Sequence, residues 1–218
     1  MHYLNCMVFK GYKLLATFYG LVCHGIFLIA GAVMFSTILT GFQFSVGALE
    51  GLSAVAINFL LLIQFPIGHS FFLSKRGMRV LEIFAPKSYA KTLRTTIYAT
   101  IASMQLILLF SLWNFSGVFV WQIEMPANLI MILLNLASWA LLSISSIQAG
   151  YKVQTGSLGW TSVYQGKEPI FPDMPTRGMF SIIRQPIYLS FSLVLWTSPQ
   201  MSLDLFIVAL TYSFYCYF

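Results

Sequence analysis

Long hydrophobic runs, separated by short polar connections, make up most of this chain. A helix needs about 20 predominantly apolar residues to cross the hydrocarbon core of a bilayer. Four runs reach that length, and they cover residues 14–39, 46–73, 95–113 and 127–148. The pattern therefore predicts four membrane-spanning helices in these segments.

A fifth apolar region covers residues 187–218 and is interrupted by a polar stretch at residues 197–202. Pro199 has no backbone donor and ends a helix, whereas Ser202 can cap the helix that follows. Each arm is short for a span, so we expect a tight helical hairpin packed against the other helices. The predicted fold class is an all-α integral membrane protein with five spanning regions, the last a broken helical hairpin, in one domain over residues 1–218.

Composition supports a membrane protein and argues against a soluble one. Of the 218 residues, 58% are hydrophobic and only 8% are charged, whereas a soluble domain carries about 25% charged residues. The net charge of +6 does not indicate nucleic-acid binding, because the cations stand in clusters between the apolar runs. Such clusters encode topology and meet anionic lipid headgroups, so membrane lipids are expected partners and nucleic acid is not.

The positions of the cations predict the orientation. All twelve Lys and Arg residues lie in the amino-terminal tail, in the connection over residues 74–94 or in the connection over residues 150–186. The other three connections hold only the acidic residues Glu50, Glu124 and Asp204. Because cytoplasmic connections carry the excess of Lys and Arg, we expect the amino terminus and both basic loops to be cytoplasmic.

The loop over residues 150–186 is the longest connection between spans. Loops longer than about 15 residues are usually functional or disordered. This one contains Trp160, Tyr164, Phe171 and Phe180, which favour an ordered lid on the membrane surface over a flexible tail.

The sequence Arg184-Gln185-Pro186 stands where the last hairpin begins. Proline is well tolerated in a first helical turn, and the free amides there attract anions. Arg184 in this position can bind a carboxylate or phosphate through two hydrogen bonds; alternatively, it anchors the helix to lipid headgroups. Gly178 either allows a close approach of the backbone to a ligand or is an ordinary turn glycine.

Two histidines are further candidates, and the sequence predicts no metal site. His69, at the end of the second apolar run, is either a base or ligand or an interfacial residue bonded to a carbonyl. His24 lies within the first run without an acidic neighbour, which favours a packing role. HExxH, GxSxG, CxxC and Walker-type patterns do not occur in the chain, so metal, serine-hydrolase and nucleotide-triphosphatase functions lack support.

The spacing Gly178-x5-Arg184-x-Pro186-x-Tyr188, followed by a helical hairpin, resembles the integral-membrane methyltransferases. These include isoprenylcysteine carboxyl methyltransferases and phospholipid methyltransferases, and the bacterial methanethiol S-methyltransferases are the most similar branch. In that branch, His69-Ser70 matches a motif at the end of the second span, and the start of the third span corresponds to Arg94-Thr95-Thr96. The likeness covers residues 55–218.

The resemblance implies a function and a set of site residues. S-adenosylmethionine would bind in a cytoplasm-facing pocket beneath the 150–186 loop, against Gly178, Arg184, Gln185, Pro186 and Tyr188. His69 would orient the acceptor, a small thiol or a lipophilic molecule that arrives from the membrane. The resemblance also implies the inner membrane of a bacterium.

Two departures from the family pattern keep an alternative open. The residue between Arg184 and Pro186 is histidine in the family, and Gln185 can neither become cationic nor act as a base. The family also continues into a cytoplasmic helix with paired glutamates, so we expect the sequence ending at Phe218 to be incomplete or shortened. The alternative is a degenerate, non-catalytic subunit of a larger membrane complex.

Overall fold

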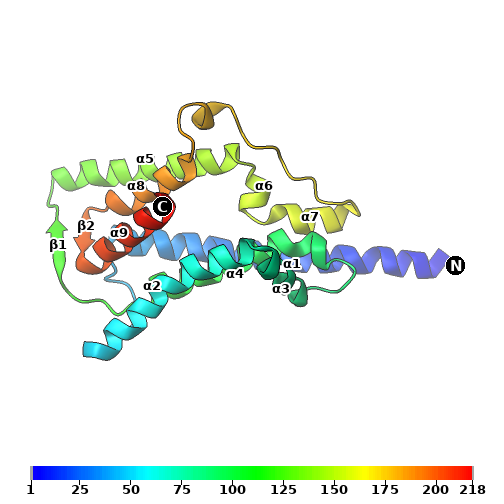
Figure 1. Cartoon of the computed structure of the whole chain (residues 1–218), viewed down its shortest axis with the longest axis horizontal. Coiled ribbons are helices and arrows are strands. Elements are labelled where there is room, and N and C mark those ends of the chain that lie inside the picture. Colours follow the sequence, from blue (N-terminus) through cyan, green and yellow to red (C-terminus); the bar gives the residue numbers. More distant parts are fainter. Residues whose placement is uncertain (1, 218) are drawn as a thin grey trace.

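The computed structural model describes residues 2–217, and it describes side chains from Gly11 onward. Four long helices run along the length of the molecule (Figure 1), and they are α1 (His2–Leu39), α2 (Gly51–Leu73), α4 (Ala90–Leu112) and α5 (Ala127–Gln148). All four are long and apolar enough to cross a membrane. The predicted all-α membrane fold is therefore confirmed.

The structure places the start of α2 five residues later than the sequence predicted. Residues 46–50 instead run beside the end of α4, where the Val46 amide donates to the Ser111 carbonyl at 2.6 Å and the Leu49 amide donates to Asn114 Oδ1 at 2.8 Å. Gly51 then begins the helix with a φ of 59°. Hydrophobicity alone did not reveal this boundary, because an apolar segment that packs on a neighbouring helix has the same composition as the start of a membrane-spanning helix.

The broken hairpin is also confirmed, with α8 (Pro186–Trp196) and α9 (Leu203–Tyr217) on either side of the polar turn. The structure adds a feature that the sequence did not predict. A short strand β1 (Phe119–Gln122) pairs antiparallel with β2 (Gln200–Ser202) in the turn itself. As expected, the Ser202 hydroxyl accepts from the Leu205 amide at 3.0 Å. The turn is thus fixed to the connection between α4 and α5.

The two basic loops contain short helices. The first holds α3 (Lys75–Leu81) and η1 (Glu82–Phe84), and the second holds α6 (Tyr151–Gln154), α7 (Ser157–Gln165) and η2 (Gly178–Ser181). Helix α7 packs against α1 and α4 (Figure 1), so this part of the loop is ordered. The Trp160 amide donates to Thr96 Oγ1 at 2.9 Å, and its indole donates to His24 Nε2 at 3.1 Å, which agrees with a packing role for His24.

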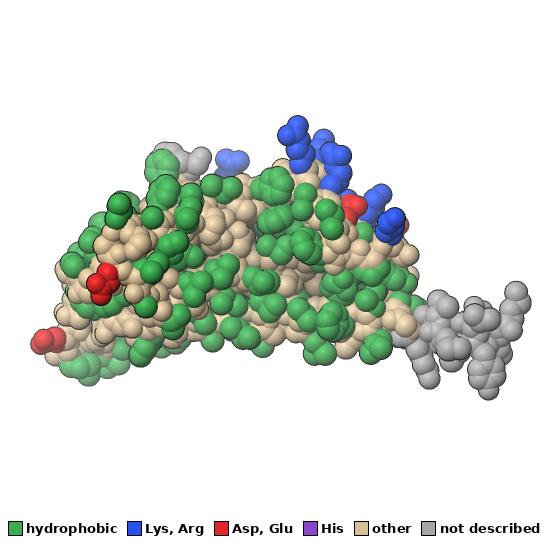
Figure 2. All heavy atoms as spheres, turned by 90° about the horizontal axis from the view of Figure 1, so that it is seen from below, with side chains coloured by type: hydrophobic (Ala, Val, Ile, Leu, Met, Phe, Trp, Pro, Cys, Tyr) green, Lys and Arg blue, Asp and Glu red, His purple; other side chains and the backbone are tan. Residues whose placement is uncertain are grey.

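The main hydrophobic core joins α1, α2, α4, α8 and α9. Phe42, Phe110, Leu195, Leu205 and Tyr212 are among its buried members. Large apolar side chains also cover much of the outer surface, as Figure 2 shows, and most of the Lys and Arg side chains visible there gather in one region, with acidic side chains both beside them and at the opposite end. An apolar exterior of this kind is suited to lipid contact.

Candidate functional site

The start of α8 has the local geometry that the sequence predicted. Pro186 is buried in the first turn, and Gln185 is the N-cap residue without a capping side-chain bond. The first hydrogen bond of the helix runs from the Leu189 amide to the Gln185 carbonyl at 3.2 Å. The amides of Ile187 and Tyr188 precede that bond, so they are among the donors that a helix start leaves without intrahelical partners.

Arg184 is the exposed cation beside this helix start. The only ion pair among the described side chains joins Arg94 to Glu82, so Arg184 has no acidic partner there. An unpaired guanidinium next to free amides is suited to an anion such as a carboxylate. Gln185 is exposed as well and forms no side-chain hydrogen bond with the described residues.

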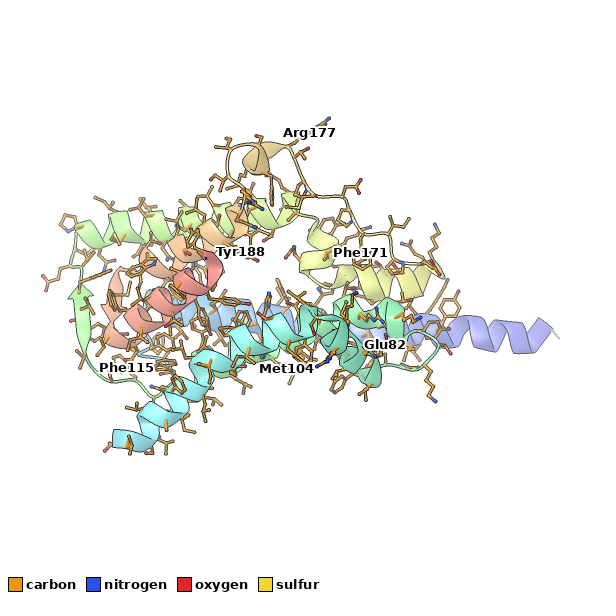
Figure 3. The ribbon with its side chains drawn as sticks, in the orientation of Figure 1. Glu82, Met104, Phe115, Phe171, Arg177 and Tyr188 are labelled. Carbon is orange, nitrogen blue, oxygen red and sulfur yellow. The ribbon has the colours of Figure 1, made fainter. Side chains whose placement is uncertain are left out.

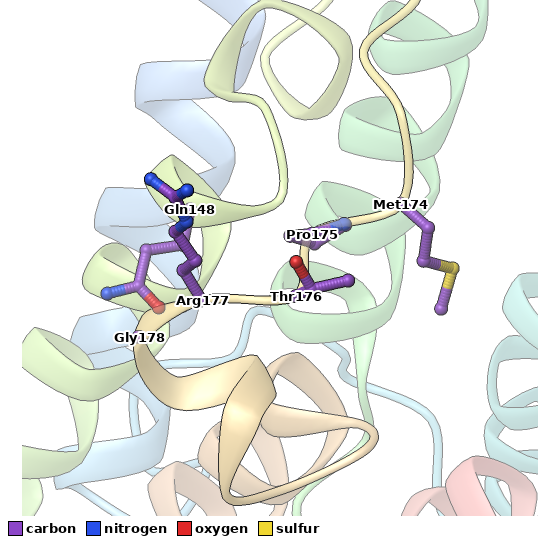
Figure 4. A pocket seen from close by; sticks show the side chains of 6 residues that line it. All are labelled: Gln148, Met174, Pro175, Thr176, Arg177 and Gly178. Atoms are coloured by element: carbon purple, nitrogen blue, oxygen red, sulfur yellow. The ribbon is translucent and has the colours of Figure 1, made fainter.

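Gly178 lies at the edge of a cavity of about 400 Å³. This volume is within the range of small-molecule pockets. Figure 4 shows Gln148 and Arg177 beside Gly178 in the cavity wall, with Met174 pointing away from them. Gly178 has a φ of 64°, and a Cβ there would lie 2.6 Å from Gln148 Oε1, which already accepts from the Met179 amide at 2.8 Å. The structure thus gives Gly178 a packing reason to be glycine, and its contact with a ligand stays a prediction.

His69 forms the other end of the candidate site, near the end of α2. The Tyr98 hydroxyl on α4 lies 2.8 Å from His69 Nδ1 and 3.0 Å from Nε2. The neighbouring Ser70 hydroxyl lies 2.8 Å from the Tyr215 hydroxyl on α9. His69 is half-buried, so its ring is held by a hydroxyl on α4 rather than by the carbonyl that the alternative interpretation expected.

Tyr188 is the residue of the α8 motif that lies near Tyr98 and Tyr215. It stands at the start of α8, as Figure 3 shows, whereas Arg177 points outward from the loop. The hydroxyl groups of Tyr98, Tyr188 and Tyr215 lie within electrostatic range of one another. We call these three residues, from α4, α8 and α9, the tyrosine cluster, and His69 and Ser70 on α2 contact two of its members. No hydrogen bond or ion pair of the described residues joins His69 to Arg184 or Gly178.

Sequence reasoning did not identify Tyr98, Tyr212 or Tyr215. Tyr98 carried a signal, because it stands one helical turn after Arg94-Thr95-Thr96 and residues three or four apart share a helix face. Tyr212 and Tyr215 carried none, because their importance depends on which neighbour α9 packs against. That packing is a tertiary feature without a local pattern.

Several bacterial proteins resemble the chain over most of its length. It is 27% identical to methanethiol S-methyltransferase 1 of Bradyrhizobium diazoefficiens over 201 residues, which cover 88% of this chain and 67% of that protein. The methanethiol S-methyltransferase of a Pseudomonas species is 24% identical over 89% of this chain and 75% of its own length. That of Mycobacterium tuberculosis is 25% identical over 68% of this chain and 60% of its own length. No protein-family model and no solved structure matches the chain.

The chain has helices that are long and apolar enough for an integral membrane protein. Its similarity to bacterial methanethiol S-methyltransferases agrees with the resemblance to the membrane methyltransferases seen in the sequence. The chain spans about two thirds of the length of the relatives it matches, so the activity of the whole protein is a matter of proposal.

Proposed function

We propose that the chain transfers a methyl group from S-adenosylmethionine to a small thiol at the cytoplasmic face of the membrane. The observation that carries the proposal is that Tyr188, in the first turn of α8, lies near Tyr98, whose hydroxyl is within hydrogen-bond distance of His69. The names of the relatives support it at the level of the family. The acceptor would reach the tyrosine cluster between α2, α4, α8 and α9.

The residues at the start of α8 fit S-adenosylmethionine. Arg184 has no acid partner among the described side chains, and the first-turn amides of α8 stand next to it, so together they suit the carboxylate of the cofactor. The tyrosine rings suit its sulfonium, because cations bind over aromatic faces. When bound, the cofactor supplies an electrophilic methyl group. Gln185 would add an amide donor or acceptor.

His69 would prepare the acceptor. A thiol with a pKa near the ordinary Cys value of about 8.5 is mostly protonated at neutral pH, and the thiolate is the nucleophile. A ring nitrogen of neutral His69 would accept the thiol proton, and the Tyr98 hydroxyl, which lies within hydrogen-bond distance of both ring nitrogens, would keep the ring in place. The acceptor sulfur is then left as a thiolate beside the tyrosine cluster.

A second candidate function rests on Gln185. Its side chain is exposed and forms no hydrogen bond with the described residues, and it stands where the family pattern has histidine. A chain that no longer binds the cofactor would serve as a non-catalytic subunit of a larger membrane complex. This alternative predicts a partner that co-purifies in fixed ratio.

Calorimetry on the purified chain in detergent separates the two functions. The proposal predicts saturable, one-site binding of S-adenosylmethionine, followed by formation of dimethyl sulfide when methanethiol is added, detected by gas chromatography. Failure to bind the cofactor, together with co-purification in a fixed stoichiometry with another membrane protein, would favour the subunit and overturn the enzyme.

A further inference from the structure

A proline stands inside the helix that carries His69. Helix α2 continues through Pro66 without a break. Proline has no amide hydrogen, so it cannot donate to the carbonyl four residues earlier, and its ring crowds that carbonyl. The carbonyl in question belongs to Leu62, which is 8% exposed. Inside a membrane, a backbone carbonyl without a donor is costly, because no water is there to replace the missing bond.

Tyr212 on α9 supplies a donor to this carbonyl. Its hydroxyl donates to the Leu62 carbonyl at 3.1 Å. The side chain is 2% exposed and belongs to the main core, so the hydroxyl would be unsatisfied without this bond. One turn later on α9, the Tyr215 hydroxyl donates to the Pro66 carbonyl at 3.5 Å and pairs with Ser70. Helix α9 thus binds α2 on both sides of the proline.

The segment after Pro66 carries the acceptor end of the candidate site. His69 follows the proline by three residues, and its ring packs on Phe65 with centroids 5.3 Å apart. The Tyr212 ring contacts Phe65 on α2 and Phe191 on α8, with centroid distances of 5.8 and 6.3 Å. Tyr212 therefore lies between the helix that begins with the proposed cofactor motif and the helix that carries His69.

We propose that Tyr212 is a positioning residue for His69, because its hydroxyl replaces the hydrogen bond that Pro66 removes from α2. The bond fixes the direction in which the segment over residues 66–73 leaves the proline, and with it the place of His69 relative to the start of α8. The role assigned to His69 rests on the proposed function. The replacement of the missing bond does not, and it can be tested without turnover.

A double-mutant cycle between positions 66 and 212 tests this directly. Tyr212→Phe keeps the buried ring and removes only the hydroxyl. Pro66→Ala restores an amide that can donate to the Leu62 carbonyl, so the hydroxyl should become dispensable. We expect Tyr212→Phe to lower kcat/KM for the thiol by about tenfold in the natural background, the effect of one buried carbonyl losing its donor. In the Pro66→Ala background the same change should cost less than about twofold.

Two further measurements distinguish positioning from general loss of structure. The Kd for S-adenosylmethionine should change less than about twofold in Tyr212→Phe, because the buried ring is retained and the Tyr212 hydroxyl is not among the proposed cofactor contacts. Amides of residues 67–73 should exchange hydrogen faster in Tyr212→Phe and at the unchanged rate when Pro66→Ala is also present. Tyr217→Phe is the matched control, since Tyr217 is an exposed tyrosine near the end of the same helix.

Equal effects of Tyr212→Phe in both backgrounds would overturn the proposal, and so would the absence of any effect on exchange in the natural background. The exchange experiment needs no methyl transfer. If the protein neither binds the cofactor nor methylates a thiol, the proposed function fails. The double-mutant cycle, measured by amide hydrogen exchange, still decides whether Tyr212 replaces the bond that Pro66 removes.

Discussion

The two ends of the candidate site differ in how their side chains are held. His69 is fixed by the Tyr98 hydroxyl and by ring contacts with Phe65. The side chains of Arg184 and Gln185 are exposed and form no hydrogen bond or ion pair with the described residues. We infer that the acceptor end is preformed, whereas the cofactor end is completed by its ligand. Single substitutions at the two ends should therefore have different signatures.

Arg184→Ala tests the cofactor end. If Arg184 binds the carboxylate of S-adenosylmethionine, the loss of a hydrogen bond to a charged group should raise the Kd at least about tenfold. Calorimetry measures it, and Lys167→Ala, which removes an exposed cation from the same loop, should leave the Kd unchanged. An unaltered Kd in Arg184→Ala would instead support the interpretation that Arg184 anchors the helix to lipid headgroups.

His69→Ala tests the acceptor end. Removing a general base costs about 100-fold or more in rate, so kcat should fall by at least that factor while the Kd for S-adenosylmethionine stays the same. Tyr98→Phe should lower kcat by a smaller factor, since it frees the ring without removing the base. Full turnover in His69→Ala, alongside loss of activity in Arg184→Ala, would make His69 a structural residue.

Gln185→His distinguishes the two candidate functions. In an enzyme, the substitution restores the family residue at an exposed position, so methyl transfer to thiols should be preserved or raised. In a non-catalytic subunit, the same variant should still fail to bind S-adenosylmethionine. Initial rates of dimethyl sulfide formation and calorimetric titration of both chains provide the comparison.

The four long helices could be predicted from sequence, because each of those apolar runs has the length of a span, and the last hairpin could be predicted because its polar stretch has a physical reason to interrupt the run. Pro199 and Ser202 located the turn of the hairpin in this way. The pairing of β1 with β2 could not be predicted, because it joins segments about 80 residues apart through only a few residues each. The cofactor motif was visible as a local spacing, whereas Tyr98, Tyr212 and Tyr215 become part of the site only through helix packing.

Asp204 fixes α9 to the connection between α4 and β1. Its buried carboxylate accepts from the Trp113 indole at 2.8 Å, and from the Ser116 amide at 2.9 Å and hydroxyl at 2.6 Å. Asp204→Ala leaves these donors without an acceptor, so we expect destabilisation by about 1–3 kcal/mol, measured as a lower Tm in detergent. The Kd for S-adenosylmethionine should be nearly unchanged when measured well below that Tm, because the tyrosine cluster lies at the other end of α9. If cofactor binding is lost as well, the substitution at the start of α9 also disturbs the tyrosine cluster at the other end of that helix.

The arrangement of charge over the whole molecule predicts its orientation. The connections over residues 74–94 and 150–186 carry ten of the twelve Lys and Arg residues, and His69 and the start of α8 stand next to these connections in the sequence. Because positive charge is retained in the cytoplasm, both ends of the candidate site should face the cytoplasm. Fusion of a compartment-specific reporter next to Glu50 or Glu124 should give the extracytoplasmic signal, and fusion within residues 74–94 the cytoplasmic one. The reverse pattern would place the site where S-adenosylmethionine made in the cytoplasm cannot reach it, and the proposed function would fail with the orientation.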